Sequence, residues 1–191
     1  MKTKWARWGV TAATVVAVAL SAFQLAKAQE QKRRIDVSPA AQTAQRIGLY
    51  DVKITYCRPG VKGRQIWNTQ IVPYNGTPMP WRAGANENTT IEFESNVKIE
   101  GKPLAAGKYG FHIVPTDSKW TLIFSKDNAS WGSFRYKQEN DALRVDVTPG
   151  ECPMQEWLVY GFDDLSATSA TATLAWEKKK IGFKIELDPA K

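Results

Sequence analysis

The sequence is poor in the residues that most often build catalytic and metal centres. It contains one histidine, His112, and two cysteines, Cys57 and Cys152, among 191 residues. No Gly-x-Ser-x-Gly, His-Glu-x-x-His or Cys-x-x-Cys motif occurs, so the signatures of α/β-hydrolases, zinc proteases and thioredoxin-like proteins are missing. A single histidine also excludes a histidine-rich metal site, and we predict neither a metal nor a cofactor.

The chain lacks the strong positive charge of a nucleic-acid-binding protein once its first segment is set apart. Four of the 26 Lys and Arg residues, and none of the 19 Asp and Glu residues, lie in residues 1–28, so the remainder carries a net charge of +3. A net charge of this size is too small to indicate a nucleic-acid-binding surface, and we predict no nucleic-acid partner.

Residues 1–28 have the pattern of a cleavable signal peptide. Lys2, Lys4 and Arg7 precede an uncharged, mostly apolar run, and Ala26-Lys27-Ala28 places small side chains where a signal peptidase requires them. The run is about 16 residues long, shorter than the ~20 of a spanning helix, which favours cleavage over an uncleaved membrane anchor. We expect an exported protein, periplasmic or extracellular, without a membrane span after cleavage, with a flexible lead-in over residues 29–39.

Residues 40–191 carry the alternating pattern of a single all-β domain. Apolar residues recur at every second position in short segments such as 52–56 and 120–124, with turn residues between the segments. Eight to ten such segments predict an antiparallel β-sandwich of jelly-roll or Greek-key type, with a closed β-barrel as the alternative. Residues 40–46 predict either one helical turn or an irregular edge strand, and Lys178 to Lys180 predict a solvated turn.

Several segments together resemble one known family. They are Tyr56 to Pro59, Trp81 to Thr90, Ala106 to His112, Trp120 to Ser125 with Trp131 to Phe134, and Ala175 to Glu177. On these residues the chain resembles an exported bacterial family catalogued as domain of unknown function 2911, which commonly has Ser at the position of Cys57. The resemblance covers nearly all of the chain after residue 28. It implies an exported β-rich domain with no established activity, and it supplies no catalytic residue.

The densest group of polar side chains follows Trp81. Arg82 offers a planar guanidinium to a carboxylate or phosphate, Asn86 offers donors and acceptors, and Trp81 offers a ring on which a flat ligand can stack. We predict that Trp81, Arg82, Asn86, Glu87 and His112 cluster in space and bind a polar ligand. The competing interpretation is a structural loop held by an Arg82–Glu87 pair and by Asn side chains bonded to the backbone.

Three residues outside that segment are further ligand-binding candidates. Arg58 and Arg64 flank a glycine-containing loop that either holds an anion through backbone N–H groups or is a tight basic turn. Trp131 is a candidate for stacking. His112 alternates with the apolar residues of its strand, so we expect it to face away from the core, either at the surface or in a cleft.

Cys57 and Cys152 are predicted to form a disulfide. An exported protein folds in an oxidising compartment, and both residues lie at predicted strand ends beside turns. The alternative is two separate small residues that pack independently.

Three functions stay open on the sequence alone. The missing catalytic signatures favour a non-enzymatic binding module of the cell envelope, whose ligand is a carbohydrate or another polar envelope molecule. The alternatives are an extracytoplasmic hydrolase that uses Arg82, Glu87 and His112, and a structural or protein-interaction domain. A carboxylate within hydrogen-bond reach of His112 would favour the hydrolase, and a flat apolar patch would favour the interaction domain.

Overall fold

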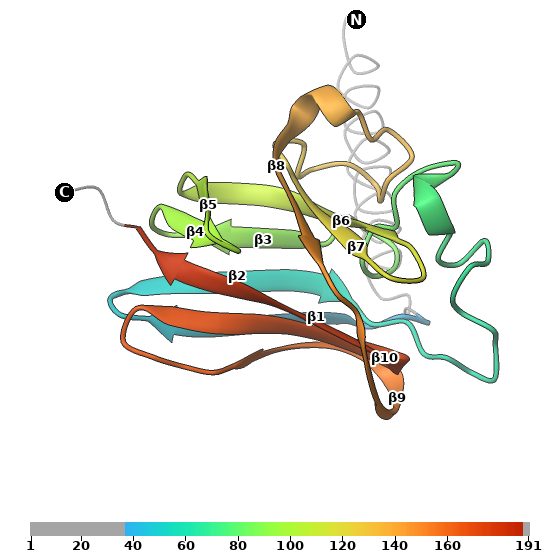
Figure 1. Cartoon of the computed structure of the whole chain (residues 1–191). Helices are drawn as coiled ribbons and strands as arrows, with labels where there is room; N and C mark the ends of the chain where they lie inside the picture. The colour runs from blue at the N-terminus through green and yellow to red at the C-terminus, as the bar shows by residue number, and fades with distance from the viewer. Residues whose placement is uncertain (1–36, 189–191) are drawn as a thin grey trace, which may run out of the picture. The chain divides into compact units, whose positions relative to one another are not determined.

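Ten β-strands form two antiparallel sheets in residues 37–188, the part of the chain that the computed structural model describes (Figure 1). The predicted signal peptide and most of the lead-in lie outside these residues. The first sheet has the order β1 (Ala40–Ile47), β2 (Tyr50–Cys57), β3 (Thr90–Phe93), β6 (Gly107–Pro115), β7 (Trp120–Ser125) and β8 (Asp141–Val147). The second has the order β5 (Lys102–Leu104), β4 (Val97–Ile99), β10 (Ser169–Leu187) and β9 (Gly150–Asp163). The short 3-10 helices η1 (Tyr74–Gly76) and η2 (Gln138–Asn140) lie in connections between strands.

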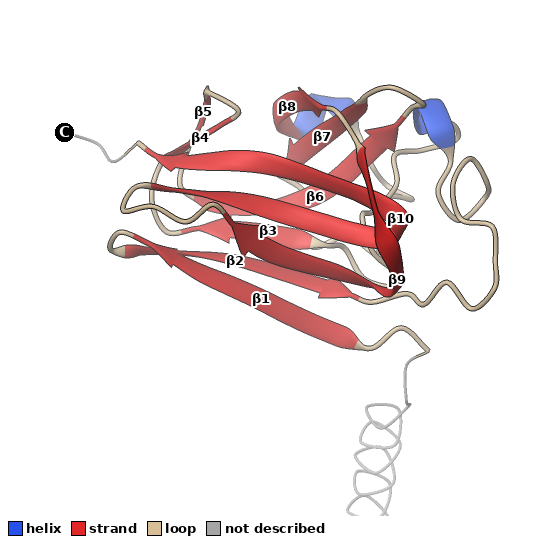
Figure 2. Cartoon of the chain, turned by 60° about the horizontal axis from the view of Figure 1, so that its bottom comes forward, coloured by secondary structure: helices blue, strands red, loops and turns tan. Residues whose placement is uncertain are grey.

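The two sheets pack face to face around one hydrophobic core (Figure 2). Phe111 and Ile113 of β6 are fully buried there, and they pair with Phe124 and Leu122 of β7, which are also fully buried. Within the described residues the sheets stay separate, which confirms the predicted all-β sandwich and makes the closed barrel wrong. No helix in this part of the chain is long and apolar enough to cross a membrane.

Four tryptophans pack against one another in the core. Trp67 contacts Trp81, Trp120 and Trp176 with ring centroids 5.9, 5.0 and 6.0 Å away, and Trp81 stacks on Trp176 at 5.9 Å. Aromatic pairs of this kind add about 0.5–1.5 kcal/mol each beyond the apolar area that they bury. The Trp81 ring is only 3% exposed, so, contrary to our expectation, it has almost no free face on which a ligand can stack.

Residues 58–64, the basic loop after β2, form a tight turn fixed by its own arginines. Arg58 Nε donates a hydrogen bond to the carbonyl oxygen of Leu158 in β9 at 2.8 Å. Arg64 donates to the carbonyl oxygens of Gly60 and Val61 at 2.6 and 3.1 Å. Because both guanidinium groups bind backbone carbonyls, the loop has the structure of the tight basic turn rather than that of an anion cradle.

Cys57 and Cys152 do not form the predicted disulfide. The chain just after Cys57 pairs with β9 at Trp157, through the bridge between Gly60 and Trp157. Cys152 lies five residues before Trp157, which is about 17 Å along an extended strand. The Cα atoms of a disulfide must lie within about 7 Å of each other. Cys57 Sγ instead donates a hydrogen bond to Glu87 Oε2 at 3.4 Å.

Candidate functional site

The segment at Trp81 extends the larger sheet beside β6. Trp81 and Ile113 exchange two backbone hydrogen bonds of 2.8 Å each, which defines an antiparallel bridge. In an antiparallel register the next residue along one strand faces the previous residue along the other, so Arg82 lies opposite His112. Both Trp81 and Ile113 point into the core, and therefore Arg82 and His112 lie on the outer face of the sheet.

The same register continues as a row of side chains across the outer face. His112 pairs with Ile123 of β7, and Ile123 pairs with Arg144 of β8. Neighbouring strands lie about 4.8 Å apart, so three strand spacings separate the backbones of Arg82 and Arg144 by about 14 Å. The row thus has an arginine at each end and a histidine between them.

The β7–β8 loop, residues 126–140, covers this row. Asn88 Nδ2 donates to the carbonyl oxygen of Asp127 at 3.2 Å, and Asn128 Nδ2 donates to that of Lys108 at 2.8 Å. These bonds fasten the first half of the loop to the sheet. Further along, Ser133 and Tyr136 bond to the side chains of the row itself.

His112 is buried by this loop. Its side chain lies on the outer face, as the strand alternation predicts, but the residue is only 2% exposed, so a surface position is wrong. Nδ1 lies 2.8 Å from Ser133 Oγ, and the ring meets Tyr136 edge-on at 5.4 Å. Burial lowers the pKa of His112 to about 4, with the negative charge of Asp127 opposing the shift and the positive charge of Arg82 adding to it. The imidazole is therefore neutral at pH 7.

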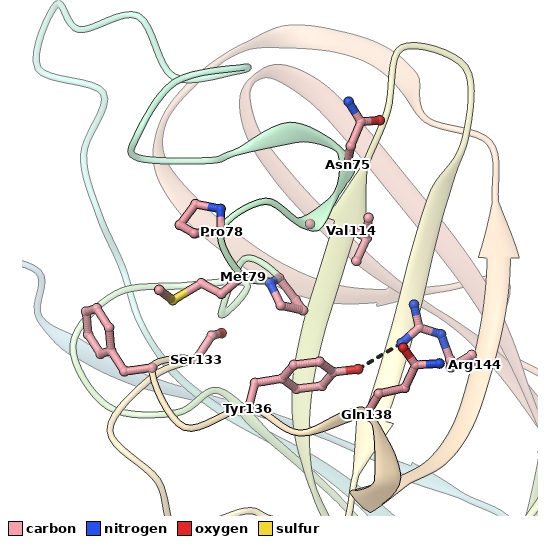
Figure 3. Close-up of a pocket in the computed structure, with 11 residues that line it drawn as sticks. Asn75, Pro78, Met79, Val114, Ser133, Tyr136, Gln138 and Arg144 are labelled. Carbon is pink, nitrogen blue, oxygen red and sulfur yellow. Dashed lines mark hydrogen bonds between the residues drawn. The ribbon is translucent and has the colours of Figure 1, made fainter.

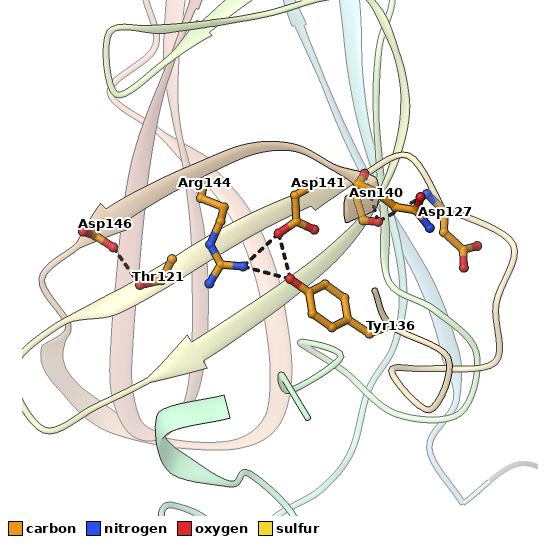
Figure 4. Close-up of polar contacts among 8 residues, drawn as sticks. Thr121, Asp127, Tyr136, Asn140, Asp141, Arg144 and Asp146 are labelled. Carbon is orange, nitrogen blue, oxygen red and sulfur yellow. Dashed lines mark hydrogen bonds and ion pairs between the residues drawn. The ribbon is translucent and has the colours of Figure 1, made fainter. Parts of the chain in front are cut away.

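Arg144, at one end of the row, is neutralised by an acid. Its NH1 donates to Asp141 Oδ2 and to Tyr136 Oη, both at 2.8 Å, and Tyr136 Oη donates to the same Asp141 oxygen at 2.7 Å (Figure 4). Burial and the hydrogen bond to Asp141 raise the pKa of Tyr136 to about 12, so its hydroxyl stays protonated. This triangle of charge-assisted hydrogen bonds fixes the second half of the β7–β8 loop.

Arg82, at the other end, has no acidic partner among the described residues. Its NH1 donates to the carbonyl oxygen of Asn86 at 2.7 Å, and its Cζ lies 4.9 Å from the centre of the Phe134 ring. Gly132 packs so closely that a Cβ there would collide with Arg82 Cζ. Burial, with no opposing contribution, lowers the pKa of Arg82. The Arg82–Glu87 pair of the structural interpretation does not form.

Two cavities lie beside the row, and Figure 3 shows the larger one. The larger, of about 350 Å³, is lined by Tyr136, Gln138 and Arg144, and the smaller, of about 130 Å³, is lined by Gln70 and Arg82. Five residues line both cavities: Pro78, Met79, Pro80, Ser133 and Phe134. We call the two together the cleft, because they adjoin and share these lining residues. One wall is the segment before β3, and the other is the β7–β8 loop.

Two aromatic side chains stand exposed on the β7–β8 loop. Trp131 is 58% and Phe134 is 64% exposed, and both line a further cavity of about 290 Å³ with Arg135. Phe134 also lines both parts of the cleft. A cavity with two exposed aromatic side chains in its lining therefore adjoins the polar cleft.

The structure brings together only part of the predicted site. Arg82 and His112 face each other, and Trp81 lies beneath them in the core. Asn86 Nδ2 donates to the carbonyl oxygen of Ser38 at 3.3 Å, as in the structural interpretation of this loop. Glu87 is bonded to Cys57 and lines neither part of the cleft. Arg58 and Arg64 lie in their own turn, and Trp131 stands on the loop that forms one wall.

Most residues of the cleft escaped the sequence interpretation, among them Met79, Ser133, Tyr136 and Arg144. The sequence could have indicated the position of Arg144, because this residue alternates with the buried Val145 and therefore faces outward from the sheet. The other three lie in segments without periodicity. Among the described residues, no group of three or more His, Cys, Asp or Glu side chains is arranged to hold a metal ion.

These features define an antiparallel β-sandwich domain with a polar cleft on the outer face of its larger sheet. A family model described as "Protein of unknown function (DUF2911)" matches residues 38–185. The chain belongs to this family, as the resemblance indicated. No curated protein and no solved structure matches the chain.

Proposed function

We propose that this protein is an exported binding module of the cell envelope, which holds a polar ligand such as a carbohydrate in the cleft. The observation that carries the proposal is the cleft itself. Its larger part, about 350 Å³, falls in the size range of small-molecule sites, and several of its walls are hydrogen-bonding side chains. A polar cleft beside exposed aromatic rings suits a sugar, whose hydroxyl groups need hydrogen bonds and whose ring faces stack.

The polar groups of the cleft are held in place without a ligand. Ser133 is bonded to His112, and Tyr136 and Arg144 are bonded to Asp141. Side chains that are already ordered lose less conformational entropy when a ligand binds, so this arrangement favours affinity.

Export is supported by residues 1–28 alone. We expect mass spectrometry of the protein from its native host to find an N-terminus at or near Gln29. Recovery of intact Met1 in the membrane fraction would contradict export with cleavage.

A thermal-shift screen tests the binding function, because a ligand that binds only the folded state raises the melting temperature. The probes are oligosaccharides of glucose, of N-acetylglucosamine and of uronic acids, together with glycerol phosphate. At 100 times the dissociation constant we expect a stabilisation of about 2.7 kcal/mol. Trp131→Ala, which removes an exposed ring from the cavity that adjoins the cleft, should reduce the shift. Trp157→Ala removes a 36% exposed tryptophan on β9 that lines neither the cleft nor this cavity, and should not.

Two results would contradict the proposal. One is a panel in which no probe raises the melting temperature. The other is a shift that Trp157→Ala reduces as much as Trp131→Ala does, because binding would then lie elsewhere on the surface.

A hydrolase is the second candidate, and one observation favours it. Ser133 Oγ lies 2.8 Å from the neutral His112 imidazole, which resembles a nucleophile beside its base. Against it, no carboxylate of the described residues is hydrogen-bonded to His112, and Glu87 is bonded to Cys57 instead. A fluorophosphonate probe separates the two functions. We expect no adduct on Ser133. An adduct on Ser133 that the His112→Asn variant does not form would instead support the hydrolase function.

A further inference from the structure

We propose that the Arg82 end of the cleft binds an oxyanion, so that the ligand carries a carboxylate or a phosphate group. This inference rests on the proposed function, since it gives the chemical class of the ligand bound in the same cleft.

The Arg82 guanidinium is fixed in position before any ligand binds. NH1 donates to the carbonyl oxygen of Asn86, the Phe134 ring lies against the group, and Gly132 packs onto it. Gly132 has φ +61°, a conformation that favours glycine, and any Cβ there would collide with Arg82. The backbone of the β7–β8 loop is therefore shaped around this arginine.

The contacts that fix Arg82 leave the N–H groups of Nε and NH2 without a hydrogen-bond acceptor among the described residues, whereas NH1 has its carbonyl partner. Two parallel N–H groups of a guanidinium form the fork that binds a carboxylate or phosphate through two hydrogen bonds. Arg82 lines the smaller part of the cleft, where such a group can reach it.

The charges at the two ends of the cleft differ. Arg144 has Asp141 as its ion-pair partner at 2.8 Å, while no ion pair in the described part of the chain includes Arg82. A partly buried charge without a counter-charge is unfavourable, and an anionic ligand group offsets that cost. The anion therefore belongs at Arg82 and not at Arg144.

Two more donors and the size of the cavity agree with an oxyanion. Ser133 and Gln70 line the same space as Arg82. If His112 Nδ1–H donates to Ser133 Oγ, the serine hydroxyl is left to donate to the anion, so a bound anion selects that tautomer. The cavity volume of about 130 Å³ equals roughly four water molecules, which suits a carboxylate or phosphate, and the adjoining 350 Å³ accommodates the rest of the ligand.

Calorimetric titration with matched probes tests the inference. The probes are a uronic-acid trisaccharide, its methyl ester, and the corresponding neutral trisaccharide with and without one phosphate group. We expect the acid or the phosphorylated sugar to bind at least 10-fold more tightly than its uncharged counterpart. If the acid binds more tightly than its ester, the anion is a carboxylate. If the phosphorylated sugar binds more tightly than the unphosphorylated one, the anion is a phosphate.

Variants of Arg82 locate the anion. Arg82→Gln should weaken binding of the charged probe by about 10- to 150-fold, the effect of losing a charged hydrogen bond in a partly buried site. Arg82→Lys should recover only part of the loss, because an ammonium lacks the fork. Arg46→Gln is the control. It removes the same charge from β1, where Arg46 forms an exposed ion pair with Asp51 of β2, and should leave binding unchanged.

The outcomes separate this inference from the proposed function. If the esters and unphosphorylated sugars bind as tightly as the charged probes, the anion site is wrong and the binding module stands. If Arg82→Gln binds the charged probe as tightly as wild type does, the anion site is likewise wrong and the binding module stands. If Arg82→Gln does not fold, Arg82→Lys and the ester comparison decide in its place. If no sugar binds in any form, both proposals fall.

Discussion

Acidification should destabilise the domain through one buried residue, His112. Its ring is 2% exposed under the β7–β8 loop, and burial holds its pKa at about 4, compared with 6.5 for an ordinary histidine. Between these two pH values the unfolded chain binds a proton at His112 and the folded domain does not. The free energy of unfolding contributed by this residue is therefore fully present above pH 6.5 and falls as the pH drops towards 4.

The size of the effect follows from the shift. A difference of about 2.5 pKa units at about 1.36 kcal/mol each gives a loss of about 3 kcal/mol between pH 6.5 and pH 4. Below pH 4 both states are protonated, so the contribution of His112 no longer changes. A loss of this size is a large part of the total stability of a domain, which is typically about 5–15 kcal/mol.

The assay compares urea unfolding of wild type and His112→Asn at several values between pH 7 and pH 4. Asparagine does not titrate, and its Nδ2 can still donate to Ser133 Oγ. Carboxyl groups titrate in both proteins, so the difference between the two curves isolates the histidine. Wild type should lose about 3 kcal/mol more than the variant over this range. Parallel curves would refute the reasoning.

The lowered pKa of His112 can be measured directly by NMR. The sequence has one histidine, so an untagged protein gives one imidazole signal to follow. We expect that signal to stay in its neutral form down to about pH 4. Titration near pH 6.5 would mean that the β7–β8 loop does not exclude water from His112 in solution.

Further substitutions test the core and the loop by urea unfolding. Gly132→Ala should cost about 2 kcal/mol or more, because it combines a positive φ with a collision at Arg82. Trp120→Ala, in the tryptophan cluster, should cost about 3–5 kcal/mol. Trp131→Ala should change stability by less than about 0.5 kcal/mol, because the residue is exposed. Tyr136→Phe should cost about 1–2 kcal/mol through the lost hydrogen bonds to Asp141 and Arg144.

Alternation along the sequence was sufficient to predict most of the strands, and in β6 the face that each side chain presents to the core. Phe111 and Ile113 point inward and His112 outward, as the pattern of period two requires. Residues 40–46 left two options, a helical turn or an irregular edge strand. The structure shows an edge strand, β1, but a regular one, because it pairs residue by residue with β2 without a shift of register. The local sequence cannot reveal that pairing, which supplies the hydrogen bonds of the strand.

The solvated turn predicted at Lys178 to Lys180 is wrong. These lysines lie inside β10, where Lys179 and Lys180 pair with Glu151 and Gly150 of β9. Two shifts of register around Glu177 let the strand continue through the charged segment. β9 lies at the edge of its sheet, so charged side chains along this ribbon stay in contact with water.

Most of the cleft, and the side-chain row beside it, was beyond prediction for a different reason. The meeting of Arg82 and His112 depends on the register between the Trp81 segment and β6, which are far apart in the sequence. The burial of His112 depends on the path of the β7–β8 loop, and that path is set by individual hydrogen bonds such as that of Asn128 to Lys108. Neither the register between distant segments nor the path of a loop produces a periodic pattern of apolar residues in the sequence.

The most direct test of the cleft as a binding site is to map a bound ligand by NMR. The protein is titrated with the probe that gives the largest thermal shift, and amide, indole and imidazole resonances are followed. We predict that the shifts concentrate on Ser133 to Tyr136, the His112 ring and the Trp131 indole, while residues 150–155 of β9 stay unchanged. Shifts centred on β9, with the β7–β8 loop and His112 unaffected, would contradict the account.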